Sequence, residues 1–268
     1  MIFKVDILTP MTTQDKLTKT LDERTTILKD SDVVNQIKTA IDKVLLDKST
    51  SFTTIRCLGL GPISDSSNAM YQLSLLNILV KHLFKENENF NISLWDPIFT
   101  KEETTYLETI PNFKVEETFE TKEIGKTLFY MPHFPIGAFE ELINQYKPKY
   151  ILSNDLMVYY YKQPEAKFFE KSLNCARLAQ LILKKSETKS DTTAEQKPVD
   201  DGFQLPTKKK NRKKTNSIKH KPIIINYDFE SAYFNDVKAT NITKGNILDN
   251  QWTSSFSDMC FMEIISKN

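Results

Sequence analysis

The first fifty residues alternate apolar and polar positions with the period of an α-helix. The clearest run recurs at spacings of three and four residues through Val33, Val34, Ile37, Ala40 and Ile41. Ser31 or Asp32 is placed to cap its start. A weaker pattern through Leu17, Leu21 and Leu28 predicts a second helix before it. Because a single apolar stripe has to be buried, both helices are expected to pack on the outside of the main domain.

From residue 52 the pattern changes to short apolar runs separated by helical ones. Predicted strands lie at residues 52–60, 91–97, 114–118, 126–132 and 149–155. Predicted helices lie between them, at residues 68–84, around 100–107 and at 138–146. The helix at 68–84 is apolar almost all round, which indicates burial on more than one side. The spacing of Thr100 and Glu103 is that of a capping box for the next helix.

The C-terminal part is less regular. Pro164 is expected to open a single helix that ends near Lys185. Residues 186–220 contain few apolar side chains, so we expect a disordered insertion there. Two further apolar runs, 221–227 and 255–265, predict strands that complete the domain.

Strands that alternate with helices imply right-handed parallel crossovers with helices on both faces of the sheet. The fold expected is therefore α/β, a Rossmann-like three-layer sandwich with a mainly parallel sheet. We divide the chain into an N-terminal helical extension at 1–51, the first part of the domain at 52–185, the basic insertion at 186–220, and the closing strands at 221–268.

Charge is distributed unevenly along the 268 residues. The formal net charge is +1, but residues 184–221 hold 12 basic and 5 acidic residues, which leaves a net charge of −6 on the rest. Nucleic acid is therefore an unlikely partner for the folded body, because phosphate binding needs a basic face. The basic run at 208–214 fits a nuclear-import signal, a nucleic-acid-binding patch or a solvated linker.

Other sequence features narrow the class of protein. No stretch approaches the roughly 20 apolar residues that span a bilayer, and the N-terminus lacks a secretory signal pattern. The three cysteines and three histidines are scattered, so neither a disulfide framework nor a metal site is expected. Cys57 lies inside a predicted strand and is interpreted as a buried apolar residue. A cytoplasmic and nuclear location is expected.

The stretch CLGLGPISDSS, residues 57–67, joins a predicted strand to a predicted helix. Gly59 and Gly61 match the first two glycines of a dinucleotide-binding fingerprint, but Ser64 occupies the third position. One interpretation is a phosphate-binding turn, in which Ser64 and Ser66 offer hydroxyls to the ligand and Asp96 at the next strand end accepts ribose hydroxyls. The other is a simple glycine turn in which Ser66 or Ser67 caps the helix.

His133 and Asn154 follow the next two predicted strands. Because parallel strands present their C-terminal ends at one edge, these residues are expected to share a crevice with Gly61 and Asp96. His133 could act there as a general base or hydrogen-bond donor, or could simply bind backbone groups of its own loop. The chain thus offers His133 as a catalytic candidate and no complete catalytic motif.

Several blocks resemble, in order, those of the sensitivity-to-red-light-reduced family, and in particular its fungal members of the benomyl-resistance type. The blocks are CLGLGPISDSSNAMYQLSLL, LWDPIFTKEE, KTLFYMPHFP, YILSND and AYFNDVKATNI, and they lie within residues 52–242. The matching positions are Gly59, Gly61, Gln72, Asp96, Pro97, Pro132, His133, Asn154, Asn235 and Asp236. Phe134 departs from the pattern where cysteine is frequent, as do Ala239 and Thr240 near a frequent histidine.

The resemblance implies a regulatory protein without an assigned catalytic activity. It links members to light and circadian signalling, to haem metabolism and, in yeasts, to microtubule-related processes. We therefore expect a regulator that binds protein partners and retains a ligand-binding crevice, with no cofactor identified. The alternative is a nucleotide- or S-adenosylmethionine-dependent transferase that uses Gly59, Gly61 and Asp96 to hold its cofactor.

Overall fold

The computed structural model describes residues 12–47, 50–85, 89–190, 225–243 and 251–267. The strands are β1 (Thr54–Leu58), β2 (Asn91–Trp95), β3 (Phe113–Val115), β4 (Thr127–Met131), β5 (Tyr150–Asn154), β6 (Phe234–Asn241) and β7 (Met259–Ser266). The α-helices are α1 (Thr13–Leu28), α2 (Asp32–Leu45), α3 (Ser67–Leu83), α4 (Lys101–Leu107), α5 (Ile136–Tyr146), α6 (Leu156–Tyr161), α7 (Glu165–Lys171) and α8 (Leu173–Ser190). Two short 3₁₀ helices, η1 (Ile124–Lys126) and η2 (Thr253–Phe256), complete the elements.

The strands form one sheet in the order β3-β2-β1-β4-β5-β7-β6. The five strands from β1 to β5 are mutually parallel, and β1 pairs with β2 in the register Ile55 to Ile92. The predicted mainly parallel sheet is therefore confirmed. β7 is the exception, because it runs antiparallel to both β5 and β6.

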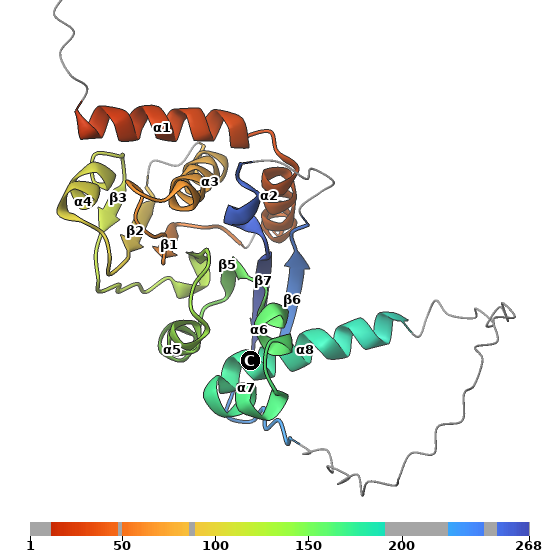
Figure 1. Ribbon diagram of the computed structural model, residues 1–268. Coiled ribbons are helices and arrows are strands. Elements are labelled where there is room, and N and C mark those ends of the chain that lie inside the picture. Colours follow the sequence, from red (N-terminus) through yellow and green to blue (C-terminus); the bar gives the residue numbers. More distant parts are fainter. Residues whose placement is uncertain (1–11, 48–49, 86–88, 191–224, 244–250, 268) are drawn as a thin grey trace, which may run out of the picture.

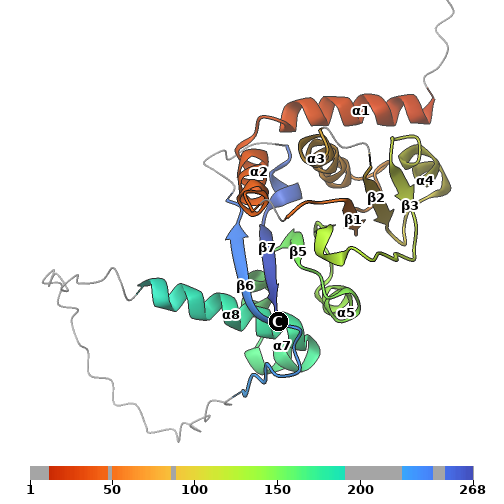
Figure 2. The same ribbon diagram turned by 180° about the vertical axis from the view of Figure 1, so that it is seen from behind.

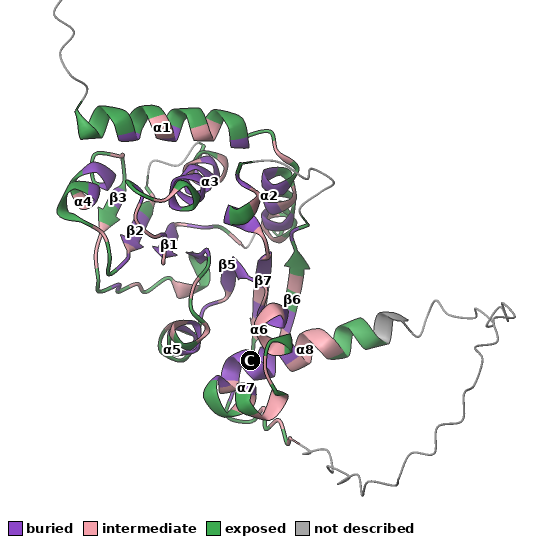
Figure 3. Cartoon of the chain, in the orientation of Figure 1, coloured by how far each residue is buried: buried purple, intermediate pink, exposed green. Residues whose placement is uncertain are grey.

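Helices cover both faces of the sheet, and this confirms the three-layer sandwich (Figures 1 and 2). Alternate residues of β4 show the division: Leu128 and Tyr130 belong to the core under α1, α2 and α3, whereas Phe129 and Met131 belong to the core under α5 and α8. The buried positions follow the sheet and the inner sides of the helices (Figure 3). Each strand of the centre is buried on both sides, as parallel sheets require.

The two N-terminal helices pack on the outside, as the periodicity predicts. Thr12 and Asp15 form a capping box at the start of α1, and Ser31 caps α2. α1 lies against α3, while α2 contacts α3 and β7. Their buried leucines and valines join the same core cluster as β1 and α3, so this segment is part of the sandwich.

The C-terminal part differs from the sequence prediction in several places. The single helix predicted from Pro164 is two helices, α7 and α8, which break at Ser172, and α8 continues to Ser190. The strand predicted at 221–227 is wrong for residues 225–227, which are irregular, and residues 221–224 lie outside the described residues. The actual edge strand is β6, further along the chain. The expected insertion beyond residue 190 also lies outside the described residues.

The structure also bears on the cysteines and on membrane-spanning helices. Cys57, Cys175 and Cys260 are free and buried, and burial raises the pKa of the Cys57 thiol far above its ordinary value. Among the described helices, none combines the length and apolarity that crossing a bilayer requires.

Candidate functional site

The turn between β1 and α3 contains both glycines in left-handed backbone conformations, with φ of 68° at Gly59 and 84° at Gly61. Side chains other than glycine rarely adopt such angles, so the two glycines are needed by the turn itself. A Cβ atom at Gly59 would lie 2.7 Å from Cδ2 of Phe134, which packs against it. Phe134, the residue that departs from the family pattern, thus fills the space beside Gly59.

The amide of Gly61 is bound by the protein's own carboxylate. Its N–H donates to Oδ2 of Asp96 at 2.9 Å, and Oδ1 of Asp96 accepts the N–H of Ile98 at 3.0 Å. Asp96 is only 9% exposed at the C-terminal end of β2. The structure brings Gly61 and Asp96 together, but with Asp96 directed at the amide that a phosphate would need.

A second carboxylate binds the same turn. Glu103, which is completely buried, accepts the N–H of Ser64 at 2.8 Å through Oε1 and the N–H of Thr100 at 2.9 Å through Oε2. Burial raises the pKa of Glu103, but the hydrogen bonds from Thr100 and Ser64 outweigh it and hold the pKa below its ordinary value. Sequence reasoning assigned Glu103 only to the capping box, which is also present.

Ser66 is the N-cap of α3, because its hydroxyl accepts the N–H of Ala69 at 3.2 Å. Its side chain is therefore engaged in ending the turn and starting the helix. Together with the carboxylates of Asp96 and Glu103, this hydrogen bonding matches the glycine-turn interpretation of CLGLGPISDSS.

His133 follows β4 in a left-handed conformation, with φ of 53°. Its Nε2 lies 3.1 Å from the carbonyl oxygen of Ser255, and its Nδ1 lies 3.4 Å from Nδ2 of Asn154. A carbonyl can only accept and an amide nitrogen can only donate, so these contacts assign the neutral tautomer with its proton on Nε2. Both ring nitrogens are then used in contacts within the protein.

Asn154 connects His133 to the segment before β7. It is 3% exposed, and its Nδ2 also donates to Oδ1 of Asp258 at 2.9 Å. Its Oδ1 is buried and has no partner among the described residues. The next residue, Asp155, caps α6 and accepts Nδ2 of Asn241 at 3.0 Å, while burial raises its pKa.

The short helix η2 lies against α3 at this edge of the sheet. The carbonyl oxygen of Ser255 in η2 accepts a hydrogen bond from Nε2 of His133. It also accepts one from the side-chain amide nitrogen Nε2 of Gln72, at 3.3 Å. The hydroxyls of Ser254 and Ser255 both donate to Oδ1 of Asn68, at 2.8 and 2.9 Å. Of the residues that the sequence offered for ligand binding, His133 is therefore bound by the protein's own η2 segment. Nothing in the sequence pattern pointed to η2.

The remaining predicted residues lie elsewhere. Asn235 and Asp236 are at the start of β6, which runs parallel to β5. They therefore lie at the N-terminal ends of these strands, whereas Asn154 lies at the C-terminal end of β5. Asp236 forms an ion pair with Lys185, with 2.6 Å between Oδ1 and Nζ. The predicted residues thus lie at two ends of the sheet. Asn235 and Asp236 are at one end, and the others, Gly59, Gly61, Ser64, Ser66, Asp96, His133 and Asn154, follow the C-terminal ends of the adjacent strands β1, β2, β4 and β5.

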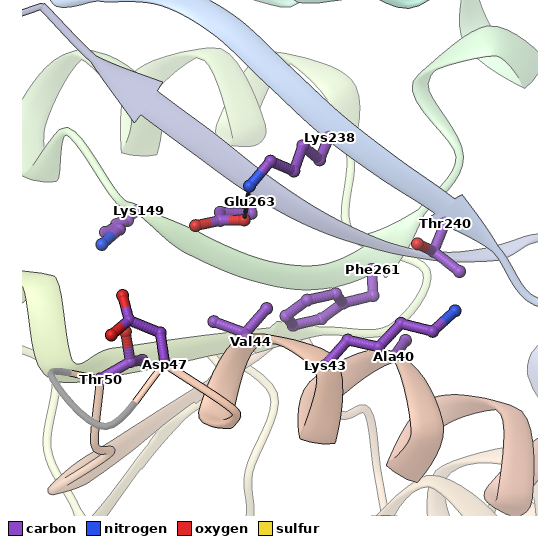
Figure 4. Close-up of a pocket in the computed structure, with 10 residues that line it drawn as sticks. All are labelled: Ala40, Lys43, Val44, Asp47, Thr50, Lys149, Lys238, Thr240, Phe261 and Glu263. Carbon is purple, nitrogen blue, oxygen red and sulfur yellow. Dashed lines mark hydrogen bonds and ion pairs between the residues drawn. The ribbon is translucent and has the colours of Figure 1, made fainter.

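A cavity of about 250 Å³ lies between α2 and strands β6 and β7 (Figure 4). Phe261, Val44 and Ala40 supply its apolar wall, and Lys43, Lys149 and Lys238 its positive charge. Lys238 is paired with Glu263 at 2.9 Å. No residue of this cavity was selected from the sequence.

Comparison with known proteins places the chain in a family. Residues 17–263 match the SRR1 domain. The chain belongs to the SRR1 domain family. Over 118 residues it is 30% identical to an Arabidopsis thaliana protein named Protein SENSITIVITY TO RED LIGHT REDUCED 1, a region that makes up 43% of this chain and 40% of that protein. No solved structure matches the chain.

The match confirms the family resemblance seen in the sequence, and it extends the SRR1 domain from α1 to β7. The alignment spans less than half of the Arabidopsis protein. The closer resemblance to fungal members of the benomyl-resistance type stays a prediction.

Proposed function

We propose that this SRR1 domain is a regulatory protein that acts by binding other proteins, and that it is not a nucleotide- or S-adenosylmethionine-dependent transferase. Its family membership supports the regulatory role. The observation that argues against a transferase is that the carboxylates of Asp96 and Glu103 bind the amides of Gly61 and Ser64. These are the donors a phosphate or ribose-binding turn would use.

A nucleotide phosphate, or the carboxylate of S-adenosylmethionine, would have to displace two buried carboxylates whose charge repels it. A carboxylate left without its amide partners in a buried site costs several kilocalories per mole, by the general magnitude of such losses. Nor is His133 poised as a base, because its unprotonated Nδ1 accepts from Asn154. The charges and hydrogen bonds of this edge are thus those of a closed structural site.

A thermal-shift screen with nucleotides and S-adenosylmethionine tests the proposal. A cofactor present at a hundredfold excess over its Kd stabilises the folded state by about 2.7 kcal/mol. We expect no shift in the melting temperature of the wild type. A reproducible shift that is lost in Gly61→Val would support the transferase alternative and refute the proposal.

The name of the Arabidopsis relative supports light signalling as one process for such a regulator. We extend the proposal to the other processes that the resemblance implies, namely circadian signalling, haem metabolism and microtubule function. Deleting the gene in its own host and measuring growth on the microtubule poison benomyl tests the last of these. Growth equal to that of the parent strain on the drug would contradict the microtubule link.

We also propose that the protein enters the nucleus as well as the cytoplasm, through the basic run at 208–214. A fluorescent fusion should accumulate in nuclei, and replacing the lysines and arginine of this run by glutamine should reduce that accumulation. An unchanged distribution would identify the run as a solvated linker.

A further inference from the structure

β6 is one of the two edge strands of the sheet, and only one of its sides is paired, with β7. Beyond its other side, the only described element is the end of α8, which projects past the sheet (Figures 1 and 2). An eight-residue strand with an unpaired side is a ready template for another extended backbone.

The register shows which backbone groups of β6 point outward. Ile242 donates its N–H to the carbonyl of Met259, so every second residue back from it, including Thr240 and Lys238, bonds to β7. Ala239 and Asn241 therefore direct their N–H and C=O groups away from the sheet. Among the described residues, none bonds to these outward groups.

The first half of the same edge is closed. A register shift interrupts the pairing between Phe234 and Asp236. At Val237, the outward N–H is bound by Oδ1 of Asp236 at 2.8 Å and the outward carbonyl by Nζ of Lys185 at 2.9 Å. Bulges and charged side chains are the usual protection of an edge strand. The outward backbone groups are thus bound by side chains at Val237, and this protection does not extend to Ala239.

Hollows lie on both sides of the open half. On the α8 side, a groove of about 450 Å³ is lined by Ile182, Ser186 and the outward part of β6. On the α2 side, one of about 320 Å³ is lined by polar residues of α2 and by Thr240, with Asp32 and Lys43 as its charged residues. Successive side chains of a strand point to opposite faces, so a strand added here would place alternate residues in the two grooves.

We propose that the open half of β6, at Ala239 and Asn241, is a docking edge for an extended segment of another protein, whose apolar residues enter the α8-side groove and whose acidic residues face Lys43. This inference rests on the proposed function, since it names the surface by which the regulator binds its partner.

Charge selects the acidic segment over a second copy of this chain. Lys43 has no ion-pair partner among the described residues. The cavity beside Phe261 is lined by three lysines and two acids, Asp47 and Glu263, so it keeps a net positive charge (Figure 4). Two copies paired through β6 would bring both sets of lysines together, whereas an acidic side chain would compensate them. Asp32 lies eleven residues before Lys43 on α2, about 16 Å away along the helix axis.

The test uses the full chain and two labelled peptides, SVEVEVES and its basic counterpart SVKVKVKS. Fluorescence anisotropy should show binding of the acidic peptide. Ala239→Pro removes one outward N–H and no bond to β7, and should weaken binding about tenfold or more. Ala239→Trp, which fills the α8-side groove, should do the same without altering the backbone. Lys43→Glu should reverse the preference between the peptides, whereas Lys29→Glu, on the exposed loop after α1, should not.

Binding that survives both Ala239 variants, or no binding of the acidic peptide to the wild type, would overturn the proposal. A concentration-dependent dimer that Ala239→Pro abolishes would also overturn it, because the edge would then belong to a second copy. The cofactor screen separates this inference from the proposed function. A silent screen with no peptide binding defeats only the docking edge, while a cofactor shift defeats the proposed function whatever the peptides do.

Discussion

Asp96 decides what the β1–α3 turn can bind. A carboxylate and a phosphate are alternative acceptors for the same backbone amide, and Asp96 already accepts this one at 2.9 Å, which is why we propose that the turn does not bind a phosphate. The two glycines look like part of a fingerprint because both kinds of turn need the same left-handed backbone. The distinguishing residue is the acid on the neighbouring strand.

Removing the Asp96 carboxylate should destabilise the protein. Asp96→Ala removes the nearly buried acceptor of the partly buried Gly61 and Ile98 hydrogen bonds, so we expect a loss of about 1–3 kcal/mol in the free energy of unfolding. Asp96→Asn retains one carbonyl acceptor and should lose roughly half as much. Urea denaturation of the two variants checks this. Equal stability of Asp96→Ala and the wild type would show that the bonds contribute nothing.

Gly61→Val tests the conformation of the turn. A Cβ atom at this position meets only Cβ of Ala69, at 3.6 Å, so space is available. The φ of 84° is nevertheless unfavourable for a β-branched residue, and we expect a loss of about 1–3 kcal/mol. The melting temperature should therefore fall while the absence of nucleotide binding remains. An unchanged melting temperature would mean that the turn relaxes freely.

At the residue scale, the sequence predicted the location of the site better than its chemistry. The strand ends and the Ser66 cap follow from periodicity, because parallel strands end at one edge. The direction of the Asp96 and Glu103 side chains does not, since it depends on the packing of α4 against the turn. Asn235 and Asp236 came only from the resemblance, and the polarity of β6 decides that they lie at the other edge.

At the scale of elements, the predicted strands and helices are most accurate where the apolar pattern is strong. β6 escaped detection because only Phe234 and Val237 of its eight residues are buried, and a register shift between Phe234 and Asp236 breaks their alternation. The break between α7 and α8 was also missed, because the helical period of apolar residues continues on both sides of Ser172 and one serine does not by itself end a helix. An edge strand and a helix break depend on contacts with segments distant in the sequence, and the local apolar pattern carries no information about those contacts.

Glu140 of α5 caps α8 from outside the helix. Its carboxylate accepts the N–H of Asn174 at 3.0 Å and that of Cys175 at 2.9 Å, which are amides of the first turn of α8. Glu140→Ala should therefore cost about 1–3 kcal/mol of unfolding free energy and raise hydrogen exchange at the start of α8. Glu140→Gln keeps one acceptor and serves as the control. Exchange rates that are equal in all three proteins would refute the capping role.

At the scale of the whole molecule, the three-layer sandwich was predictable because five strands and three helices alternate in order from residue 52 to residue 155. The antiparallel placement of β7 was not predictable, since its connection to β6 passes through residues without a strong pattern. The N-terminal helices share a core with β1 and α3. Removing them would thus expose a face of the sheet.

Residues 191–220 should be dispensable for folding. Their composition is polar, and changing the length of a connection alters its closure entropy by only about 0.6 kcal/mol per doubling. Replacing them with a Gly/Ser linker should leave the melting temperature within a few degrees, with a scrambled segment of the same composition as control. Loss of cooperative unfolding in the linker variant alone would show that this segment packs on the domain.

Acid should destabilise the fold in a defined range of pH. The pKa values of Glu103, Glu116 and Asp236 lie below their ordinary values in the folded state; burial alone would raise each of them, and hydrogen bonds with neighbours reverse that effect. Such groups stabilise the folded state above the unfolded pKa, which is 4.5 for glutamate, and this stability is lost as the pH falls through the folded pKa. Asp155 has the opposite sign, because burial raises its pKa.

Glu103 offers the cleanest test of this balance, since it is fully buried and its hydrogen bonds come from Ser64 of the turn and Thr100 at the α4 cap. At neutral pH, Glu103→Gln should be less stable than the wild type by about 1–3 kcal/mol, because a charged acceptor is replaced by a neutral one. As the pH falls below 4.5 and through the lowered folded-state pKa of Glu103, the wild-type carboxylate becomes protonated and the difference should shrink. Urea denaturation of both proteins across this range measures it. A difference that stays constant with pH would show that the contribution of Glu103 is steric, and that the charge of its carboxylate does not hold the turn.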